Sequence, residues 1–265
     1  TPDNPYAQGR LTRIVETGAS IAYRYDHRGN VIEVRHTRAG LSQVVRYDYD
    51  NMDRLTGITY PSGRHVTLQR EAAGGITAVT SAGEGEAPQT VASQIRYLPF
   101  GPTSRLRYGN GVLRQLSYDQ DYRLQRILDS GVATLKDRQY GYDAFDNISA
   151  IFDNLMPQRD QRFVYDDLHR LQRAEGHYAG NTTQWHYEYD PVGNRLWAQR
   201  LSADGSVERQ AYDYAPGGNR LVEAGGTQYQ YDARGNIVRA GTLDYHYNDR
   251  NRLAAVSRDG ELLAA

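Results

Sequence analysis

The chain has 265 residues, a formal net charge of −1 and a pI near 6.6, so no long-range attraction to nucleic acid or to an anionic membrane is expected. It contains no apolar run of about 18 residues, which excludes a membrane-spanning helix, and no cysteine, which excludes disulfides and thiolate chemistry. The 22 tyrosines against 4 phenylalanines favour sheet faces that stay partly wet, since each phenolic hydroxyl needs a partner.

One pattern recurs along the whole chain. Residues 23–31 read YRYDHRGNV, residues 187–195 read YEYDPVGNR and residues 229–237 read YQYDARGNI. With the second Tyr as anchor, twelve repeats begin at Pro5, Tyr25, Tyr49, Arg70, Tyr97, Tyr118, Tyr142, Tyr165, Tyr189, Tyr214, Tyr231 and Tyr247. The array predicts one repeat domain, residues 1–265, in which Glu71–Ser93 is a degenerate repeat with a long loop. The chain has no starting Met, so we expect it to be a piece of a longer protein.

The residue after the anchor has turn chemistry. An Asp side chain accepts a hydrogen bond from a backbone N–H two residues further on, and a following Gly or Asn tolerates positive φ. The YD motif is therefore interpreted as a hairpin corner. The residues expected to hold the repeats together are Tyr25, Asp26, Gly29, Tyr49, Asp50, Tyr118, Asp119, Tyr142, Asp143, Tyr165, Asp166, Tyr189, Asp190, Gly193, Tyr231, Asp232 and Gly235.

The segments that flank each corner predict strands. Tyr residues two apart, such as Tyr229 and Tyr231, lie on one face of a strand, and Gln230 points to the other. After the corner, aliphatic residues recur three apart, as at Val31 and Val34. That spacing does not fit a flat strand, so either the first aliphatic belongs to the corner or a bulge intervenes.

These elements predict an all-β fold. Two strands per repeat give a continuous antiparallel hairpin ribbon of about 24 strands, which at this width must curl. We expect a partial spiral shell, a solenoid-like β-cage wall, that is a fragment of a larger shell. The end strands, near residues 12–17 and 254–258, are expected to be raw edges that invite edge-to-edge self-association.

No catalytic, cofactor or metal site is predicted. The seven histidines show no metal-ligand spacing such as HExxH. Asp48, Asp50 and Asp53 resemble part of a calcium loop, but the Gly and the distal Glu of such loops are missing. Paired carboxylates for glycoside hydrolysis, nucleophile elbows and phosphate-binding Gly loops are not favoured either. We therefore expect a chain that is not an enzyme.

The repeated YDxxGN and YDxxGR corners, with YxY before and an aliphatic after, resemble the YD repeats of the Rhs family. That family includes bacterial Rhs toxins, the B and C components of Tc toxins and the YD shell of teneurins. The resemblance implies a hollow β-cocoon that encloses a C-terminal toxin domain before delivery, in a protein secreted or exported from a bacterium. It implies as partners the rest of the shell and the enclosed toxin domain, with secretion-system spike or chaperone proteins as further candidates. Many bacterial members end in an aspartyl autoprotease segment. Residues 190–193, DPVG, resemble its DPxG motif, but they occupy an ordinary repeat corner, so no cleavage role is assigned.

A second interpretation of the tyrosine rows remains open at this stage. Exposed aromatic rows are typical of carbohydrate-binding faces, so an extracellular carbohydrate-binding or adhesive repeat module is the alternative function. The rows equally suit packing of the sheet itself, which is the interpretation favoured here.

Overall fold

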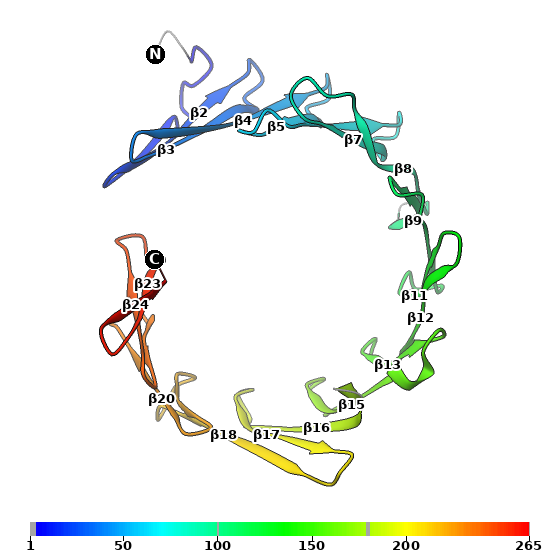
Figure 1. Cartoon of the computed structure of the whole chain (residues 1–265), viewed down its shortest axis with the longest axis vertical. Helices are drawn as coiled ribbons and strands as arrows, with labels where there is room; N and C mark the ends of the chain where they lie inside the picture. The colour runs from blue at the N-terminus through cyan, green and yellow to red at the C-terminus, as the bar shows by residue number, and fades with distance from the viewer. Residues whose placement is uncertain (1–3, 100, 179–180, 265) are drawn as a thin grey trace. The chain divides into compact units, whose positions relative to one another are not determined.

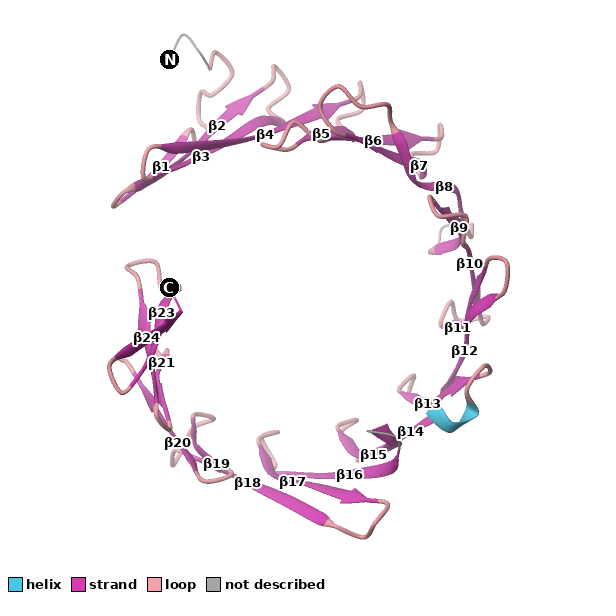
Figure 2. Cartoon of the chain, viewed as in Figure 1, coloured by secondary structure: helices cyan, strands magenta, loops and turns pink. Residues whose placement is uncertain are grey.

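The computed structural model describes residues 4–99, 101–178 and 181–264. Within these residues the chain forms 24 β-strands and a single 3-10 turn, η1 (Pro157–Arg159) (Figure 2). The prediction of an all-β chain of antiparallel hairpins is confirmed. The chain divides into two compact units, Thr1–Gln139 and Tyr140–Ala265, with the boundary inside strand β12.

The first unit is a strip in which each strand pairs antiparallel with its neighbour in the sequence, and Figure 1 shows this strip bending from blue to green. Its strands are β1 (Arg13–Glu16), β2 (Ala19–Tyr25), β3 (Val31–Arg38), β4 (Leu41–Tyr49), β5 (Leu55–Thr59), β6 (His65–Arg70), β7 (Ile76–Ala82), β8 (Gln89–Tyr97), β9 (Thr103–Tyr108), β10 (Leu113–Tyr118), β11 (Leu124–Ser130) and β12 (Thr134–Tyr142).

The second unit repeats the same neighbour-to-neighbour pairing. Its strands are β13 (Ile148–Asp153), β14 (Gln161–Tyr165), β15 (Leu171–Tyr178), β16 (Asn181–Tyr189), β17 (Arg195–Ser202), β18 (Val207–Tyr214), β19 (Leu221–Ala224), β20 (Thr227–Tyr231), β21 (Ile237–Ala240), β22 (Leu243–Tyr247), β23 (Leu253–Arg258) and β24 (Glu261–Ala264). The prediction that residues 254–258 form an unpaired edge strand is wrong, because β23 pairs with β22 on one side and with β24 on the other.

Each unit is a single layer of sheet. Among the described residues the only buried hydrophobic side chains are the small Ala174 and Ala224. Most globular domains bury one face of a sheet against a second layer. Here the tyrosine and aliphatic side chains are half-buried by their neighbours on the same face, so stability depends on contacts between successive strands.

A β-bulge at each corner explains the three-residue spacing of the aliphatic side chains. Tyr25 lies opposite Val31 and Arg24 lies opposite Glu33, so Ile32 is an extra residue in β3. The extra residue returns Val31 and the residue three further on, Val34, to the same face. The same register shift occurs before Tyr49, Arg70, Tyr118, Tyr165, Tyr189, Tyr214, Tyr231 and Tyr247.

The anchor hydroxyl ties each repeat to the one before it. Tyr49 donates its phenolic hydrogen to the carbonyl oxygen of Val31 at 3.1 Å, and Val31 is the first residue after the preceding corner. Arg70 stands where other repeats have Tyr, and its Nε and Nη2 donate to the equivalent carbonyl of Leu55 at 3.2 and 3.1 Å. The same bond joins Tyr25 to Leu11, Tyr97 to Ile76, Tyr118 to Thr103, Tyr165 to Ile148 and Tyr189 to Leu171.

The ladder predicts a face-specific sensitivity in β14. Tyr165→Phe removes only the hydroxyl that donates to Ile148, so we expect a loss of about 1 kcal/mol in the free energy of unfolding. Val164 is the adjacent residue, is 48% exposed and points to the other face. Val164→Ala should therefore change stability by less than about 0.5 kcal/mol. Urea unfolding of the three proteins measures both effects, and equal losses for the two variants would contradict the face assignment.

Candidate functional site at the YD corners

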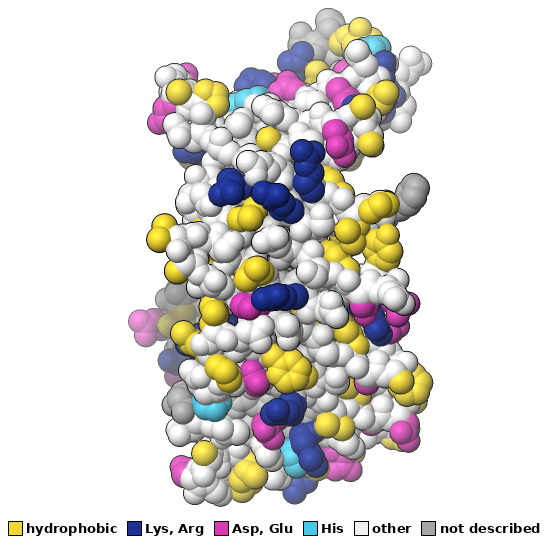
Figure 3. Space-filling view, turned by 90° about the vertical axis from the view of Figure 1, so that its right-hand side faces the viewer, with side chains coloured by type: hydrophobic (Ala, Val, Ile, Leu, Met, Phe, Trp, Pro, Cys, Tyr) yellow, Lys and Arg dark blue, Asp and Glu magenta, His cyan; other side chains and the backbone are white. Residues whose placement is uncertain are grey.

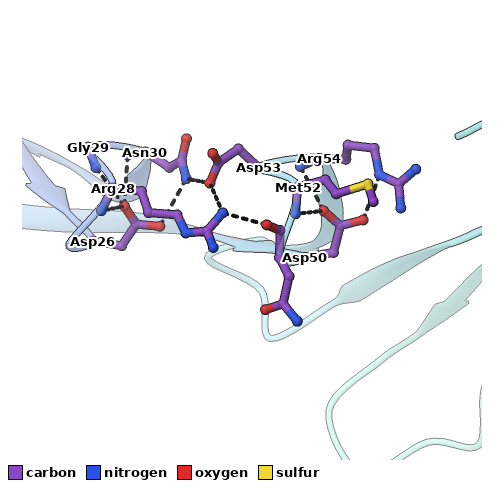
Figure 4. A network of polar contacts seen from close by, with 9 residues as sticks. Asp26, Arg28, Gly29, Asn30, Asp50, Met52, Asp53 and Arg54 are labelled. Atoms are coloured by element: carbon purple, nitrogen blue, oxygen red, sulfur yellow. Dashed lines mark hydrogen bonds and ion pairs between the residues drawn. The ribbon is translucent and has the colours of Figure 1, made fainter.

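The carboxylate of the YD motif organises its corner. In the first full corner, Oδ1 of Asp26 accepts the backbone N–H groups of Arg28, Gly29 and Asn30 at 2.9, 2.8 and 2.9 Å, and Oδ2 accepts the amide of Asn30 at 3.0 Å (Figure 4). The backbone closes around the carboxylate, because Asp26 N–H donates to Asn30 O at 3.0 Å and Gly29 N–H donates to Asp26 O at 3.1 Å. One side chain thus satisfies donors that would otherwise depend on water.

The other six Asp corners repeat this arrangement. In each, the Asp accepts the backbone N–H groups of the second and fourth residues after it, and the fourth side chain closes the ring of contacts. That fourth side chain is an amide at Asn147, Asn194 and Asn236, and a guanidinium Nε at Arg54, Arg123 and Arg170. The seven carboxylates belong to Asp26, Asp50, Asp119, Asp143, Asp166, Asp190 and Asp232.

Four further corners keep the turn with another residue in place of Asp, namely Glu71, Leu98, Ala215 and Asn248. Asn248 uses its Oδ1 in the same way, accepting from the backbone of Arg250 at 3.0 Å and Arg252 at 3.1 Å. The corner at Glu71 retains only the two backbone bonds, with Gly75 and Gly74. The degenerate repeat in Glu71–Ser93 therefore keeps the backbone of the turn without the carboxylate at its centre.

The third residue after the Asp always has positive φ. Gly29 and Gly193 have φ of 96°, which suits glycine. The same position is occupied by Asp53, Tyr122, Asp146, His169 and Asn251, with φ between 60° and 68°. Asn and Asp accept this region more readily than bulky residues do, so His169 and Tyr122 need another reason to stand there.

Contacts between successive corners supply a reason at three of these positions, Asp53, His169 and Asn251. The amide of Asn30 donates to Oδ1 of Asp53 in the next corner at 2.7 Å, and Asn147 contacts Nδ1 of His169 at 3.2 Å. Asn194 reaches Asn219 and Asn236 reaches Asn251 in the same way. An Asn that ends one corner thus contacts a polar side chain of the next corner. At Asp53, His169 and Asn251 that side chain belongs to the residue with positive φ.

An Arg that ends a corner is usually followed by Gly. A Cβ at Gly29 would overlap the guanidinium of Arg10, and a Cβ at Gly74 would lie 3.2 Å from Nη1 of Arg54. Arg170 precedes Gly193 and Arg220 precedes Gly235, while Asp146 after Arg123 departs from the pattern. The guanidinium groups of Arg10, Arg170 and Arg220 lie over the next anchor rings, Tyr25, Tyr189 and Tyr231, at 5.7, 4.8 and 5.3 Å. Sequence reasoning missed this pairing, although the alternation of residue types along the corners carries its signal.

Hydrogen bonding holds the corner carboxyls ionised. The amide of Asn147 is the main cause that lowers the pKa of Asp143, and the amide of Asn236 does the same for the pKa of Asp232. The backbone N–H of Arg54 is the main cause of the lowered pKa of Asp50. At the remaining corners partial desolvation raises the pKa, but side-chain and backbone hydrogen bonds outweigh it and leave the pKa low. Those corners are at Asp26, Asp119, Asp166 and Asp190.

The carboxylates that could serve as metal ligands or catalytic groups lie apart or already accept hydrogen bonds within the corners. Asp50 is held in its own corner, whereas Asp53 faces Asn30 and Arg28 of the preceding one. In the part of the chain that the structure describes, no three His, Asp or Glu side chains gather as metal ligands do. The carboxylate of Asp190 accepts from Val192 and Asn194, as in every other Asp corner.

Adjacent carboxylates in one corner provide a matched test of the corner Asp. Asp166→Ala removes the acceptor of Leu168 N–H, Arg170 N–H and Arg170 Nε, so we expect a clear drop in the denaturation midpoint. Asp167 is exposed, and Asp167→Ala removes the same charge without those acceptors, so its midpoint should stay near that of the wild type. Thermal and urea unfolding compare the two variants. A similar drop in both would mean that charge, and not the corner bonds, sets stability.

The lowered pKa values also predict an acid limit. Each corner Asp has a folded-state pKa below its ordinary value of 3.8, so its contribution to stability is fully present above that value and is lost as the pH falls through the folded pKa. We expect the free energy of unfolding to be nearly flat from neutral pH to about pH 5 and to fall steeply below about pH 4. Urea unfolding across this range measures the fall. It should be shallower in Asp232→Asn, and a fall centred near the histidine range would contradict the assignment.

Comparison with known proteins places this arrangement among toxin and teneurin shells. Residues 6–86 and 163–263 match the Teneurin YD-shell family. The chain is 24% identical over 305 aligned residues to the toxin protein Tse5 of Pseudomonas aeruginosa, covering 96% of this chain and 21% of Tse5. The solved Tc holotoxin pore of Photorhabdus luminescens is similar with a TM-score of 0.80 and 18% identity, over 95% of this chain and 15% of that chain. The TcdB2–TccC3 complex gives the same four values.

The chain spans 21% of the length of Tse5 and 15% of the Tc chains, so it corresponds to one segment of each. The two matched stretches cover more than half of the chain and contain the corners of Asp26, Asp50, Asp166, Asp190 and Asp232. The family resemblance predicted from the corner motif is confirmed: the chain belongs to the Teneurin YD-shell family.

Proposed function

We propose that this chain is a wall segment of an Rhs-type toxin shell, and that the complete shell encloses and protects a C-terminal toxin domain before delivery. The observation that carries the proposal is the repeated corner, in which an Asp, a bulge and an anchor hydroxyl recur from strand pair to strand pair. Such a repeat extends a sheet without adding a catalytic group. Membership of the YD-shell family supports the same structural role.

The carbohydrate-binding alternative is not favoured. A sugar platform needs flat aromatic faces that are free to stack on a ligand. The hydroxyls of Tyr49, Tyr165 and Tyr189 instead donate to backbone carbonyls of the preceding repeat. The ring of Tyr189 also carries the guanidinium of Arg170. These contacts account for the tyrosine rows as the packing of the wall itself.

The proposal includes partners and a location. The rest of the shell and the enclosed toxin domain are the expected partners, and secretion-system spike or chaperone proteins remain further candidates. No helix among the described residues is long and apolar enough to cross a membrane. We propose export from a bacterium, with further shell strands pairing along the sides of β1 and β24 that lie away from their partner strands β2 and β23. In isolation the same sides would support edge-to-edge self-association.

Protection of the toxin domain tests the proposed function in the full-length parent protein. We expect the C-terminal domain to resist trypsin in the intact parent and to be cleaved much faster in Asp166→Ala, because a disrupted corner opens the wall. Asp167→Ala is the matched control and should protect like the wild type. The measurement is the half-life of the C-terminal domain on a gel, beside the same domain expressed alone. Equal half-lives for the isolated domain and the wild-type parent would overturn the proposal.

A further inference from the structure

Three arginines gather on one face of β8 and β9 without an acidic partner. Arg96 in β8 lies directly opposite Arg105 in β9, and Arg107 is on the same face of β9 as Arg105. Like charges placed opposite each other destabilise a strand pair. None of the three forms an ion pair with any carboxylate among the described residues. Figure 3 shows basic side chains clustered on the face that it displays, at about the height of β8 and β9 in Figure 1.

Elsewhere in the sheet, arginines on neighbouring strands surround an acid. Glu33 is 5% exposed and lies between Arg35 at 2.9 Å and Arg46 at 3.1 Å, with Arg24 at 3.9 Å. In the same unit, two bidentate pairs join adjacent strands at 2.7 Å, Arg114 with Asp129 and Arg126 with Asp137. The Arg96, Arg105 and Arg107 cluster therefore has the cations of the Glu33 arrangement without its carboxylate.

A strained bulge places Arg96 in this cluster. Ser93 lies opposite Arg107 and Arg96 lies opposite Arg105, so β8 has one residue more than β9 over this interval. Gln94 within the bulge has φ of 52°, a left-handed conformation that is unfavourable for a glutamine. In a regular ladder Arg96 would face Ser104 and point to the opposite face of the sheet. The bulge thus creates a pair of like charges that the sheet itself does not need, which is the kind of strain found at functional sites.

The guanidinium groups of this cluster keep donors available. Arg96 and Arg105 are exposed and Arg107 is half-buried. Arg105 donates to Oε1 of Gln94 at 3.3 Å and Arg107 donates to the carbonyl of Gly111 at 2.7 Å. Each guanidinium has five N–H donors, so several remain for a ligand, and their planar fork matches a carboxylate.

We propose that Arg96, Arg105 and Arg107 form a docking site for a carboxylate-rich segment of a partner polypeptide. A Glu or Asp of that segment takes the position among the three guanidinium groups that Glu33 takes among Arg24, Arg35 and Arg46. The proposal goes beyond the wall function, because it assigns a binding surface to a cluster of arginines that lie opposite one another without the carboxylate found at Glu33. The site is compact and its margins are the uncharged Ser93, Gln94 and Gln115. That suits a few carboxylates better than a long phosphate backbone, and the chain as a whole has a net charge of −1.

Binding of a short fluorescent peptide of alternating Glu and Ser tests the proposal, with a Gln and Ser peptide as the uncharged control. Fluorescence anisotropy should show saturable binding of the Glu peptide alone, weakened at least about tenfold between low salt and about 0.5 M salt. The combined variant Arg96→Gln, Arg105→Gln and Arg107→Gln should lose at least about tenfold in affinity.

A second combined variant, Arg38→Gln, Arg234→Gln and Arg258→Gln, makes the same change in net charge at exposed arginines elsewhere. It should bind the Glu peptide like the wild type. Equal losses in the two combined variants would show that net charge alone attracts the peptide and would overturn the site. Tighter binding of a single-stranded oligonucleotide than of the Glu peptide would also overturn it, since the ligand would then be a phosphate polymer.

Arg105→Glu separates binding from folding. It places an acid opposite Arg96, so the strand pair should be at least as stable as in the wild type, while the Glu peptide should no longer bind. Urea unfolding and anisotropy are measured on the same sample. Retained peptide affinity in this variant would overturn the proposal. A marked loss of stability would do so as well, because it would show that the arginine pair serves the fold.

Discussion

The structure depends on one interaction, the acceptance of corner backbone N–H groups by a single carboxylate. A tight turn between two strands exposes donors that the sheet cannot satisfy, and the Asp after each anchor satisfies them within the turn. Because Asp26 and its counterparts do this locally, each Asp corner can form without a buried core beside it. The turn fixes the bulge, the bulge sets which residues face the tyrosines, and the anchor hydroxyl then reaches the preceding repeat.

Arginine suits this architecture better than lysine does. Of the 31 basic residues only Lys136 is a lysine. A planar guanidinium can pair with a carboxylate through two bonds and can also stack on an aromatic ring, which an ammonium group does less well. Both uses occur here. Arg126 forms a bidentate pair with Asp137 on the neighbouring strand. Arg170 donates to Asp166 in its own corner and also lies over the ring of Tyr189. In a single-layer sheet these contacts replace part of the packing that a second layer would supply.

The two faces of this single-layer sheet differ, and each suits a different task. The tyrosine face and the corners are committed to contacts inside the sheet, which fits enclosure. On the other face several arginines pair with acids on the same or neighbouring strands, as around Glu33 and at Asp137. The cluster of Arg96, Arg105 and Arg107 differs because a bulge at Gln94 brings like charges together. A segment whose main task is structural can therefore still offer a specific surface to an acidic partner.

The all-β fold, the hairpin corners and the family could all be predicted from the sequence, because the interactions behind them are local and repeated. An Asp with Gly or Asn three and four residues later specifies its own turn, as at Asp26 and Asp190, whatever lies around it. Contacts between repeats were decided only by the tertiary structure. Nothing local to Arg70 indicates that it reaches the carbonyl of Leu55 as a tyrosine would, and nothing local to His169 explains its left-handed backbone until Asn147 lies beside it. The arginine cluster is of the same kind, because one extra residue in β8 determines the face on which Arg96 lies, and a bulge is set by the pairing of two strands and not by either sequence alone.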